Sequence, residues 1–141
     1  MILVTRRGGK GIILALFVVY SLLLVGSSLI PMDQAGQEGS MFSALKPNVQ
    51  NVLHIPMMAL FSFLLLSGFE CFADFPRRGL LLGIALSIGF AVLLELIQVF
   101  VPGRYPSLMD MTLNIAGIGI GMAANSLVLQ RRRFGRSNES K

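Results

Sequence analysis

The chain has 141 residues, of which 54% are hydrophobic and only 13% are charged, and its mean hydropathy is +0.73. A soluble domain carries roughly 25% charged residues, so twelve bases and seven acids are too few to cover the surface of a soluble domain of this length. The net charge of +5 does not indicate nucleic-acid binding, since the bases flank apolar segments, and a single cysteine excludes an intrachain disulfide framework.

Four apolar stretches are long enough to cross a membrane as helices, at residues 11–30, 52–69, 79–100 and 111–129. A hydrocarbon core of about 30 Å needs about 20 helical residues, and continuous apolar runs favour helices over barrel strands. We therefore predict an all-α polytopic membrane protein with a four-helix transmembrane bundle. The remaining segments are an N-terminus at 1–10, a loop at 31–51 and a basic tail at 130–141.

The first stretch, 11–30, carries no charge and follows a basic flank, as a signal peptide would. Its apolar run is longer than the roughly 7–15 residues of a signal-peptide core, and no A-x-A cleavage site follows it. We therefore expect this segment to stay in the protein as a helix. The loop 31–51 is polar, contains glycine and proline, and could act as a lid over a site at that side of the bundle.

The second and third stretches carry the first polar candidates. His54 lies at the start of the second stretch, just before Pro56, which a first helical turn tolerates. Glu95 is the only formal charge well inside a predicted span, where a centred charge costs at least about 2.5 kcal/mol. Gln98 lies one turn later on the same face. A charge retained at such a cost indicates a role.

The fourth stretch has a matching polar and small-residue stripe. Asp110 opens it, and Asn114 follows one turn later. A negative charge suits a helix N-terminus, so Asp110 could serve only as a cap. Gly117 and Gly121 form a small-x-x-x-small pair that favours close helix packing. Since the third stretch also has a small-residue face, we expect the third and fourth helices to form a hairpin packed through these faces.

The distribution of bases predicts the orientation. Ten of them flank the spans on one side: Arg6, Arg7, Lys10, Arg77, Arg78, Arg131, Arg132, Arg133, Arg136 and Lys141. The other side has two, Lys46 and Arg104. The positive-inside rule therefore places both termini in the cytoplasm. For a bacterial cell this predicts a multi-pass protein of the cytoplasmic (inner) membrane.

With this orientation the polar candidates fall at one depth, near the outer surface: His54, Glu95, Gln98, Arg104, Asp110 and Asn114. Arg104 is the only base near two carboxylates, so we expect it to pair with at least one of them. Two interpretations stay open. The residues form a pocket, with Glu95 and His54 as acid–base candidates and the others as substrate-binding residues, or they form a structural ion network between helices. A metal site of His54, Glu95 and Asp110 is a weaker alternative, and we expect no metal or other cofactor.

Part of this pattern resembles a known family. The polar and glycine positions that carry the resemblance are Glu95, Gln98, Gly103, Arg104, Ser107, Asp110, Asn114 and Gly117. They are similar to the signature of the VanZ-like family of small membrane proteins, and the segment 51–56 with Phe61 resembles the family's second-helix motif around a histidine. The resemblance covers about residues 48–121. Many relatives carry an Asp-Lys pair shortly before the histidine, where this chain has Gln50 and Asn51.

The resemblance implies a link to the cell envelope, because the family's namesake is associated with low-level resistance to the glycopeptide teicoplanin. We therefore expect a protein that binds or modifies an envelope amphiphile, such as a lipid-linked precursor or a lipopeptide, with membrane lipids as its surroundings. Two alternatives remain: a small proton-coupled transporter that uses Glu95, and a structural or accessory membrane subunit. The second alternative predicts that changes at Glu95 or Asp110 alter only stability or assembly.

Overall fold

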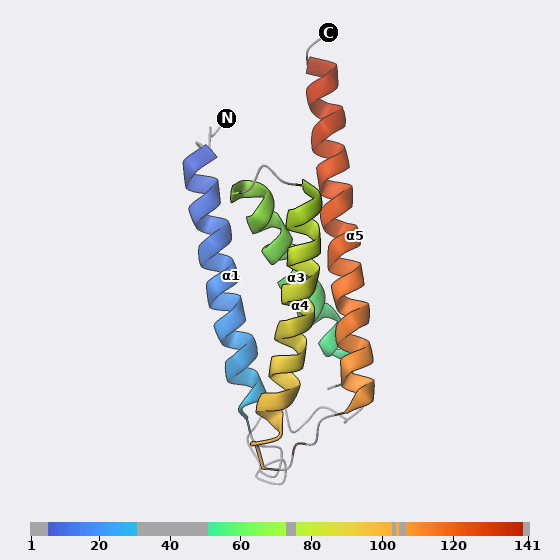
Figure 1. Cartoon of the computed structure of the whole chain (residues 1–141). Coiled ribbons are helices and arrows are strands. Elements are labelled where there is room, and N and C mark those ends of the chain that lie inside the picture. Colours follow the sequence, from blue (N-terminus) through green and yellow to red (C-terminus); the bar gives the residue numbers. More distant parts are fainter. Residues whose placement is uncertain (1–5, 31–50, 73–75, 103, 105–106, 140–141) are drawn as a thin grey trace.

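The computed structural model describes residues 6–30, 51–72, 76–102, 104 and 107–139. This part of the chain is all-helical and contains no strand. Its helices are α1 (Arg6–Ser28), α3 (His54–Phe72), α4 (Pro76–Gln98) and α5 (Leu108–Glu139), shown in Figure 1. The prediction of an all-α membrane bundle with four main helices is confirmed.

The helix ends differ from the predicted spans mainly at α5. This helix has 32 residues and continues to Glu139, whereas the predicted span ends at 129. Hydropathy marks where a chain leaves the hydrocarbon, but arginine and glutamine are good helix formers and prolong the helix beyond that point. At about 1.5 Å per residue, α5 is about 48 Å long, and Figure 1 shows it projecting past the other helices.

Three helices are long and apolar enough to cross a membrane, through Gly11–Ser28, Arg78–Gln98 and Leu108–Arg131. The apolar part of α3 is shorter and covers His54–Phe69. Large apolar side chains point outward from the bundle, for example Leu22 with 66% and Leu81 with 68% of their surface exposed. An outer surface of this kind fits a hydrocarbon solvent.

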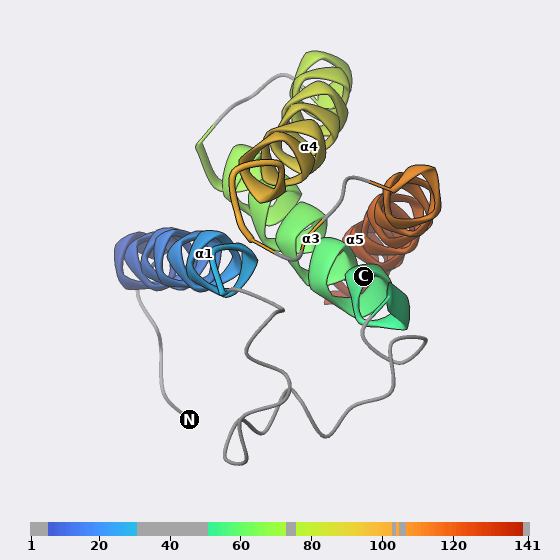
Figure 2. The same cartoon turned by 90° about the horizontal axis from the view of Figure 1, so that it is seen from below.

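The short helix α3 occupies the centre of the bundle. Figure 2 shows it between α1 on one side and α4 and α5 on the other. An aromatic contact runs through it: the ring of Phe61 lies 5.3 Å from Phe17 of α1 and stacks at 4.2 Å on Phe90 of α4. The hydroxyl of Tyr20 in α1 also donates to the carbonyl of Met57 in α3, at 3.0 Å. These contacts hold α1 to the centre.

The small-residue faces of α4 and α5 pack against α3, so the expected hairpin packing between α4 and α5 is wrong. A Cβ on Gly117 would lie 3.0 Å from the Met58 Cβ of α3, and one on Gly121 would meet Ser62 and Ala59. A Cβ on Gly83 of α4 would collide with Leu66 of α3. The glycines of α4 and α5 therefore face a third helix: Gly117 and Gly121 lie against the backbone of α3, and Gly83 lies against the Leu66 side chain.

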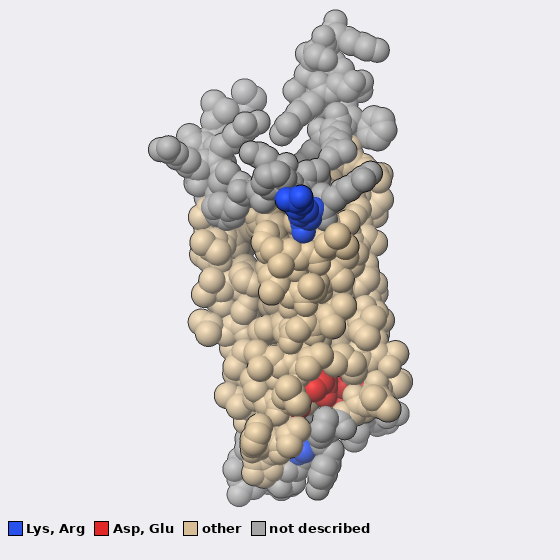
Figure 3. Space-filling model, in the orientation of Figure 1, with Lys and Arg blue, Asp and Glu red and all other residues tan. Residues whose placement is uncertain are grey.

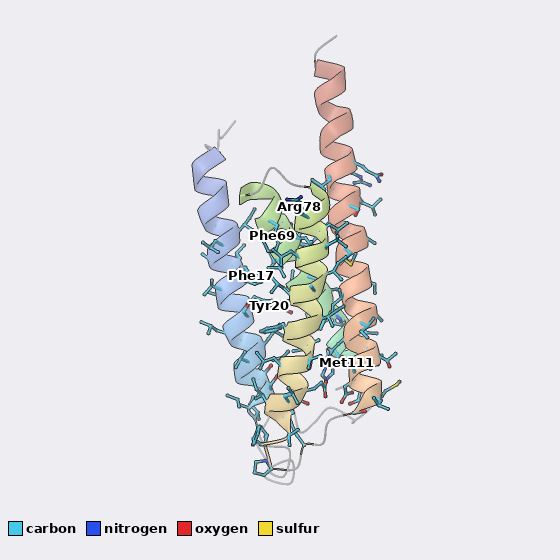
Figure 4. The ribbon with its side chains drawn as sticks, viewed as in Figure 1. Phe17, Tyr20, Phe69, Arg78 and Met111 are labelled. Atoms are coloured by element: carbon cyan, nitrogen blue, oxygen red, sulfur yellow. The ribbon has the colours of Figure 1, made fainter. Side chains whose placement is uncertain are left out.

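Both termini lie at one end of the bundle, as Figure 1 shows, and the connection from α4 to α5 lies at the other end. Figure 4 labels Arg78 at the end where the termini lie and Met111 toward the opposite end. The proposed lid at 31–51 lies outside the described residues, except for its last residue, Asn51. The arrangement sets the start of α3, the end of α4 and the start of α5 close together.

Candidate functional site

The six polar residues that the sequence singles out lie at the end of the bundle opposite the termini. We call them the polar site: His54, Glu95, Gln98, Arg104, Asp110 and Asn114. Helix α3 supplies the first from its start, α4 the next two from its last turns, the connection Arg104, and α5 the last two from its first turns. Four of them are buried, with Asn114 only 1% exposed. The structure therefore brings together side chains that the sequence separates by up to sixty positions.

A continuous hydrogen-bonded chain joins three helices in this site. The Asn114 Nδ2 group donates to Glu95 Oε1 at 3.3 Å, and the Asn114 Oδ1 atom lies 3.0 Å from His54 Nδ1. A side-chain amide carries a donor and an acceptor on separate atoms of one group. Asn114 can therefore bridge a carboxylate and an imidazole that do not touch each other.

This bridge defines which nitrogen of His54 carries the proton. Because the Asn114 amide donates to a carboxylate, its oxygen faces the imidazole and can only accept. The Nδ1 atom of His54 must then be the donor, and in the neutral ring Nε2 is the basic nitrogen. An asparagine that orients a histidine in this way also occurs in the catalytic groups of some enzymes.

Glu95 lies against the N-terminus of α5. Besides Asn114, its carboxyl group is close to the backbone of Ser107 and interacts electrostatically with Asp110 and His54. Ser107 caps α5, since its Oγ accepts from the Met109 N–H at 3.1 Å. A helix N-terminus favours negative charge, which explains how a carboxylate is tolerated at this position.

Arg104 connects the polar site to α1. Its Nη2 group donates to the carbonyl of Ser27 at 3.3 Å. Burial lowers the pKa of Arg104, while Asp110 and Glu95 raise it, and a guanidinium remains charged at any physiological pH. The expected direct ion pair is not formed among the described residues, because the guanidinium turns toward the α1 backbone instead of a carboxylate.

Three buried polar atoms of the polar site have no hydrogen-bond partner: Glu95 Oε2, Arg104 Nε and Asp110 Oδ1. A buried polar group without a partner costs about 1–3 kcal/mol, and a charged one costs more. All three belong to charged side chains from different elements. The hydrogen-bonding capacity of the site is therefore not used up by its own residues.

Gln98 is 5% exposed and lies one turn beyond Glu95 at the end of α4. Its backbone carbonyl accepts from Val101 N at 3.1 Å, in the turn that leads to Arg104. Among the described residues no group of three His, Cys, Asp or Glu side chains could hold a metal ion. The alternative of a metal centre at His54, Glu95 and Asp110 therefore has no geometric support.

A second polar contact joins α3 and α5 nearer the end where the termini lie. The Asn125 Nδ2 group donates to Ser67 Oγ at 3.1 Å. The sequence does not identify Ser67 as the partner of Asn125, because a lone serine in an apolar helix usually bonds to its own backbone. This Ser67–Asn125 pair is neutral.

An apolar groove lies elsewhere in the part of the chain that the structure describes. A groove of about 190 Å³ opens between α1 and α3, lined by Ile13, Leu14, Phe17, Leu64, Leu65, Gly68 and Phe69. Figure 4 labels Phe17 and Phe69 toward the end where the termini lie, away from the polar site. The groove offers no polar group and adds nothing to the chemistry of the site.

Comparison of the chain with curated proteins and with solved structures gives no match. The family model described as VanZ/LLP1 matches residues 12–129. The match includes the apolar spans of α1, α3, α4 and α5 and all six residues of the polar site. This membrane protein therefore belongs to the VanZ/LLP1 family.

Proposed function

We propose that this protein binds the polar head group of an envelope amphiphile at the polar site. The observation that carries the proposal is the set of three buried, unpartnered atoms at Glu95, Arg104 and Asp110. Buried polar atoms normally find partners, and a head group that reaches this depth would supply them. A guanidinium recognises phosphate or carboxylate well, so Arg104 is the residue we assign to the acidic part of the ligand.

The proposal includes an orientation with both termini in the cytoplasm and the polar site in the outer half of the bacterial inner membrane. Supporting it are the bias of basic residues and the position of both termini at one end. Single cysteines at Ser40 and Ser140, in a Cys71→Ser background, test it. A membrane-impermeant maleimide should label intact cells at position 40 only, and labelling at position 140 only would reverse the orientation.

Lipidomics of the purified protein tests the binding proposal. Wild-type protein should carry an enriched amphiphile, and Arg104→Ala should lose it. Asn125→Ala is the matched control, since it removes a buried polar contact outside the polar site. An identical lipid profile for wild-type protein and Arg104→Ala would contradict head-group binding. A role in glycopeptide tolerance would follow if expression of the wild-type chain, but not of Arg104→Ala, raised the teicoplanin concentration that cells survive.

A catalytic version of the proposal rests on the chain from His54 through Asn114 to Glu95. Here His54 Nε2 would accept a proton from the bound amphiphile, and Glu95 would balance the charge that develops. Chemical change of the amphiphile by wild-type protein and none by Glu95→Gln would support this version. Full activity of Glu95→Gln would exclude it.

A proton-coupled transporter fits less well. Glu95 would have to exchange protons with both sides of the membrane, yet the core beside the polar site is apolar and includes Met58, Phe61, Leu94 and Ile118. The buried polar side chains that the structure describes toward the end where the termini lie, Ser62, Ser87 and Asn125, are neutral and do not titrate. Transport driven by a pH gradient in proteoliposomes, and lost in Glu95→Gln, would favour the transporter over simple binding.

A further inference from the structure

The hydrogen-bonding character of the unpartnered atoms restricts the ligand, provided that the polar site binds a head group as proposed above. Glu95 Oε2 and Asp110 Oδ1 can only accept when ionised, and Arg104 Nε can only donate. The ligand must therefore present N–H or O–H donors to the carboxylates and an acceptor to the guanidinium. A purely anionic head group satisfies Arg104 and leaves both carboxylates unpartnered.

The charges of the polar site restrict the ligand further. When both acids are ionised, the site holds two carboxylates against one guanidinium, and the two acidic side chains are only 6% and 9% exposed. Charges buried to this degree need compensation. Hydroxyl groups of a sugar would supply hydrogen bonds but no charge, whereas an ammonium group supplies both.

The two acidic side chains reach the surface of the bundle with only a small part of their area. Figure 3 shows this acidic surface on one side of the bundle, toward the end opposite the termini. Among the side chains that the structure describes, the acids are Glu95 and Asp110, so this surface belongs to them. Their neighbours in α4 and α5 include the exposed apolar side chains of Leu96 and Met109, which favours approach from the lipid and hence a membrane lipid over a soluble ligand.

We propose that the polar site recognises the aminoalkyl phosphate head group of a membrane lipid, with a primary ammonium at Glu95 and Asp110 and the phosphate at Arg104. The ammonium would donate to Glu95 Oε2 and Asp110 Oδ1. The phosphodiester would accept from Arg104 Nε, while Nη2 keeps its bond to Ser27. Asn114 would act as a positioning residue that holds the Glu95 carboxyl in place through Oε1.

A methylation series of one lipid provides the test. Phosphatidylethanolamine, its monomethyl and dimethyl forms and phosphatidylcholine share the phosphate and the acyl chains but lose one N–H donor at each step. Native mass spectrometry of the protein released from nanodiscs of each lipid measures the bound fraction. Binding should fall along the series and end about tenfold lower for phosphatidylcholine, as the loss of charge-assisted hydrogen bonds predicts.

Variants separate the two halves of the head group. Asp110→Asn and Glu95→Gln should flatten the series, because they replace a carboxylate that accepts charge-assisted N–H bonds by a neutral amide that accepts weaker ones. Arg104→Ala should lower binding of every member by a similar factor and preserve their ratio, and Asn125→Ala should change nothing. Free phosphoethanolamine should not compete at concentrations at which the lipid does, and effective competition would assign the site to a soluble ligand.

The failures of the two proposals are distinguishable. Equal binding of all four lipids by wild-type protein, still reduced by Arg104→Ala, would overturn the ammonium assignment and leave head-group binding in place. Stronger binding of a glycosyl lipid than of phosphatidylethanolamine would also overturn it. Lipid binding that no variant alters would overturn both. The wild-type series alone decides the ammonium assignment if a variant fails to fold, as size-exclusion chromatography would show.

Discussion

Two asparagines of α5, Asn114 and Asn125, make side-chain contacts to α3 that differ in kind. Near the end where the termini lie, Asn125 and Ser67 form a single neutral hydrogen bond. At the other end, Asn114 joins His54 to Glu95, and three charged side chains around it keep unpartnered buried atoms. A contact that only holds helices together needs no charge and no unused hydrogen-bonding capacity. The difference separates a structural contact from a candidate binding site within one helix pair.

The largest expected effect comes from Gly121, which packs on α3 between these two contacts. In Gly121→Leu the side chain would enter α3 at Ser62 and Ala59, which we expect to destabilise the protein by about 3 kcal/mol, at the upper end of overpacking effects. Both polar contacts would then be lost together. Unfolding in SDS followed by circular dichroism measures the effect.

Gly119→Leu is the control for Gly121→Leu, because nothing lies within 4 Å of a Cβ at Gly119. This variant should fold and keep wild-type stability or gain slightly, since leucine is a better helix former than glycine. Equal losses for both variants would show that α5 does not pack on α3 through Gly121.

The next largest effect is expected at Asn114, whose loss should cost more stability than the loss of Asn125. Asn114→Leu leaves the Glu95 carboxylate and the His54 ring without their partner, which should cost about 2–3 kcal/mol. Asn125→Leu leaves only the Ser67 hydroxyl, which can turn to its own helix backbone, and should cost about 1 kcal/mol. The same SDS unfolding measurement compares them, and equal costs would remove the distinction between the two contacts.

Removal of the Glu95 charge should stabilise the protein, whereas removal of the Asn125 side chain should destabilise it. Glu95→Gln keeps the shape of the side chain and removes a buried charge, so we expect a gain of about 1 kcal/mol in stability together with weaker lipid binding, as in other sites where function costs stability. Asn125→Ala should lose stability and keep lipid binding. Loss of stability without loss of binding in Glu95→Gln would identify Glu95 as purely structural.

The smallest expected effect is the coupling within the Ser67–Asn125 pair. A double-mutant cycle with Ser67→Ala and Asn125→Ala should give about 0.6 kcal/mol, the average for hydrogen bonds between membrane helices. None of the three variants should alter lipid binding. A coupling several times larger would mean that this pair also belongs to a strained or charged environment.

The sequence predicted the spans and the residues of the polar site but not the contacts between them. Apolar runs locate helices because lipid cannot satisfy the backbone, and Glu95 stands out because charge in a membrane is costly. The role of Asn114 as the bridge between Glu95 and His54 depended on which helices meet. Sequence order suggested that the small faces of α4 and α5 pack on each other, whereas both faces lie against α3, Gly121 at its backbone and Gly83 at the Leu66 side chain.

The position of Arg104 shows a second limit. Its guanidinium contacts the backbone carbonyl of Ser27, and a carbonyl is present at every residue, so no sequence pattern marks this partner. Opposite charges at Glu95 and Asp110 suggested an ion pair instead. The bridge from Arg104 to α1 could be found only from the three-dimensional arrangement, and it leaves Nε available at the polar site.

The short apolar part of α3 also affects the membrane around the protein. His54–Phe69 rises only about 24 Å, which is about 6 Å less than a typical hydrocarbon core. Such hydrophobic mismatch thins the adjacent bilayer at a cost of a fraction of a kcal/mol per Å. We therefore expect the lipids beside the start of α3 to lie deeper than their neighbours, with their phosphates closer to the level of His54. We expect the protein to prefer thin bilayers and to lose stability as acyl chains lengthen.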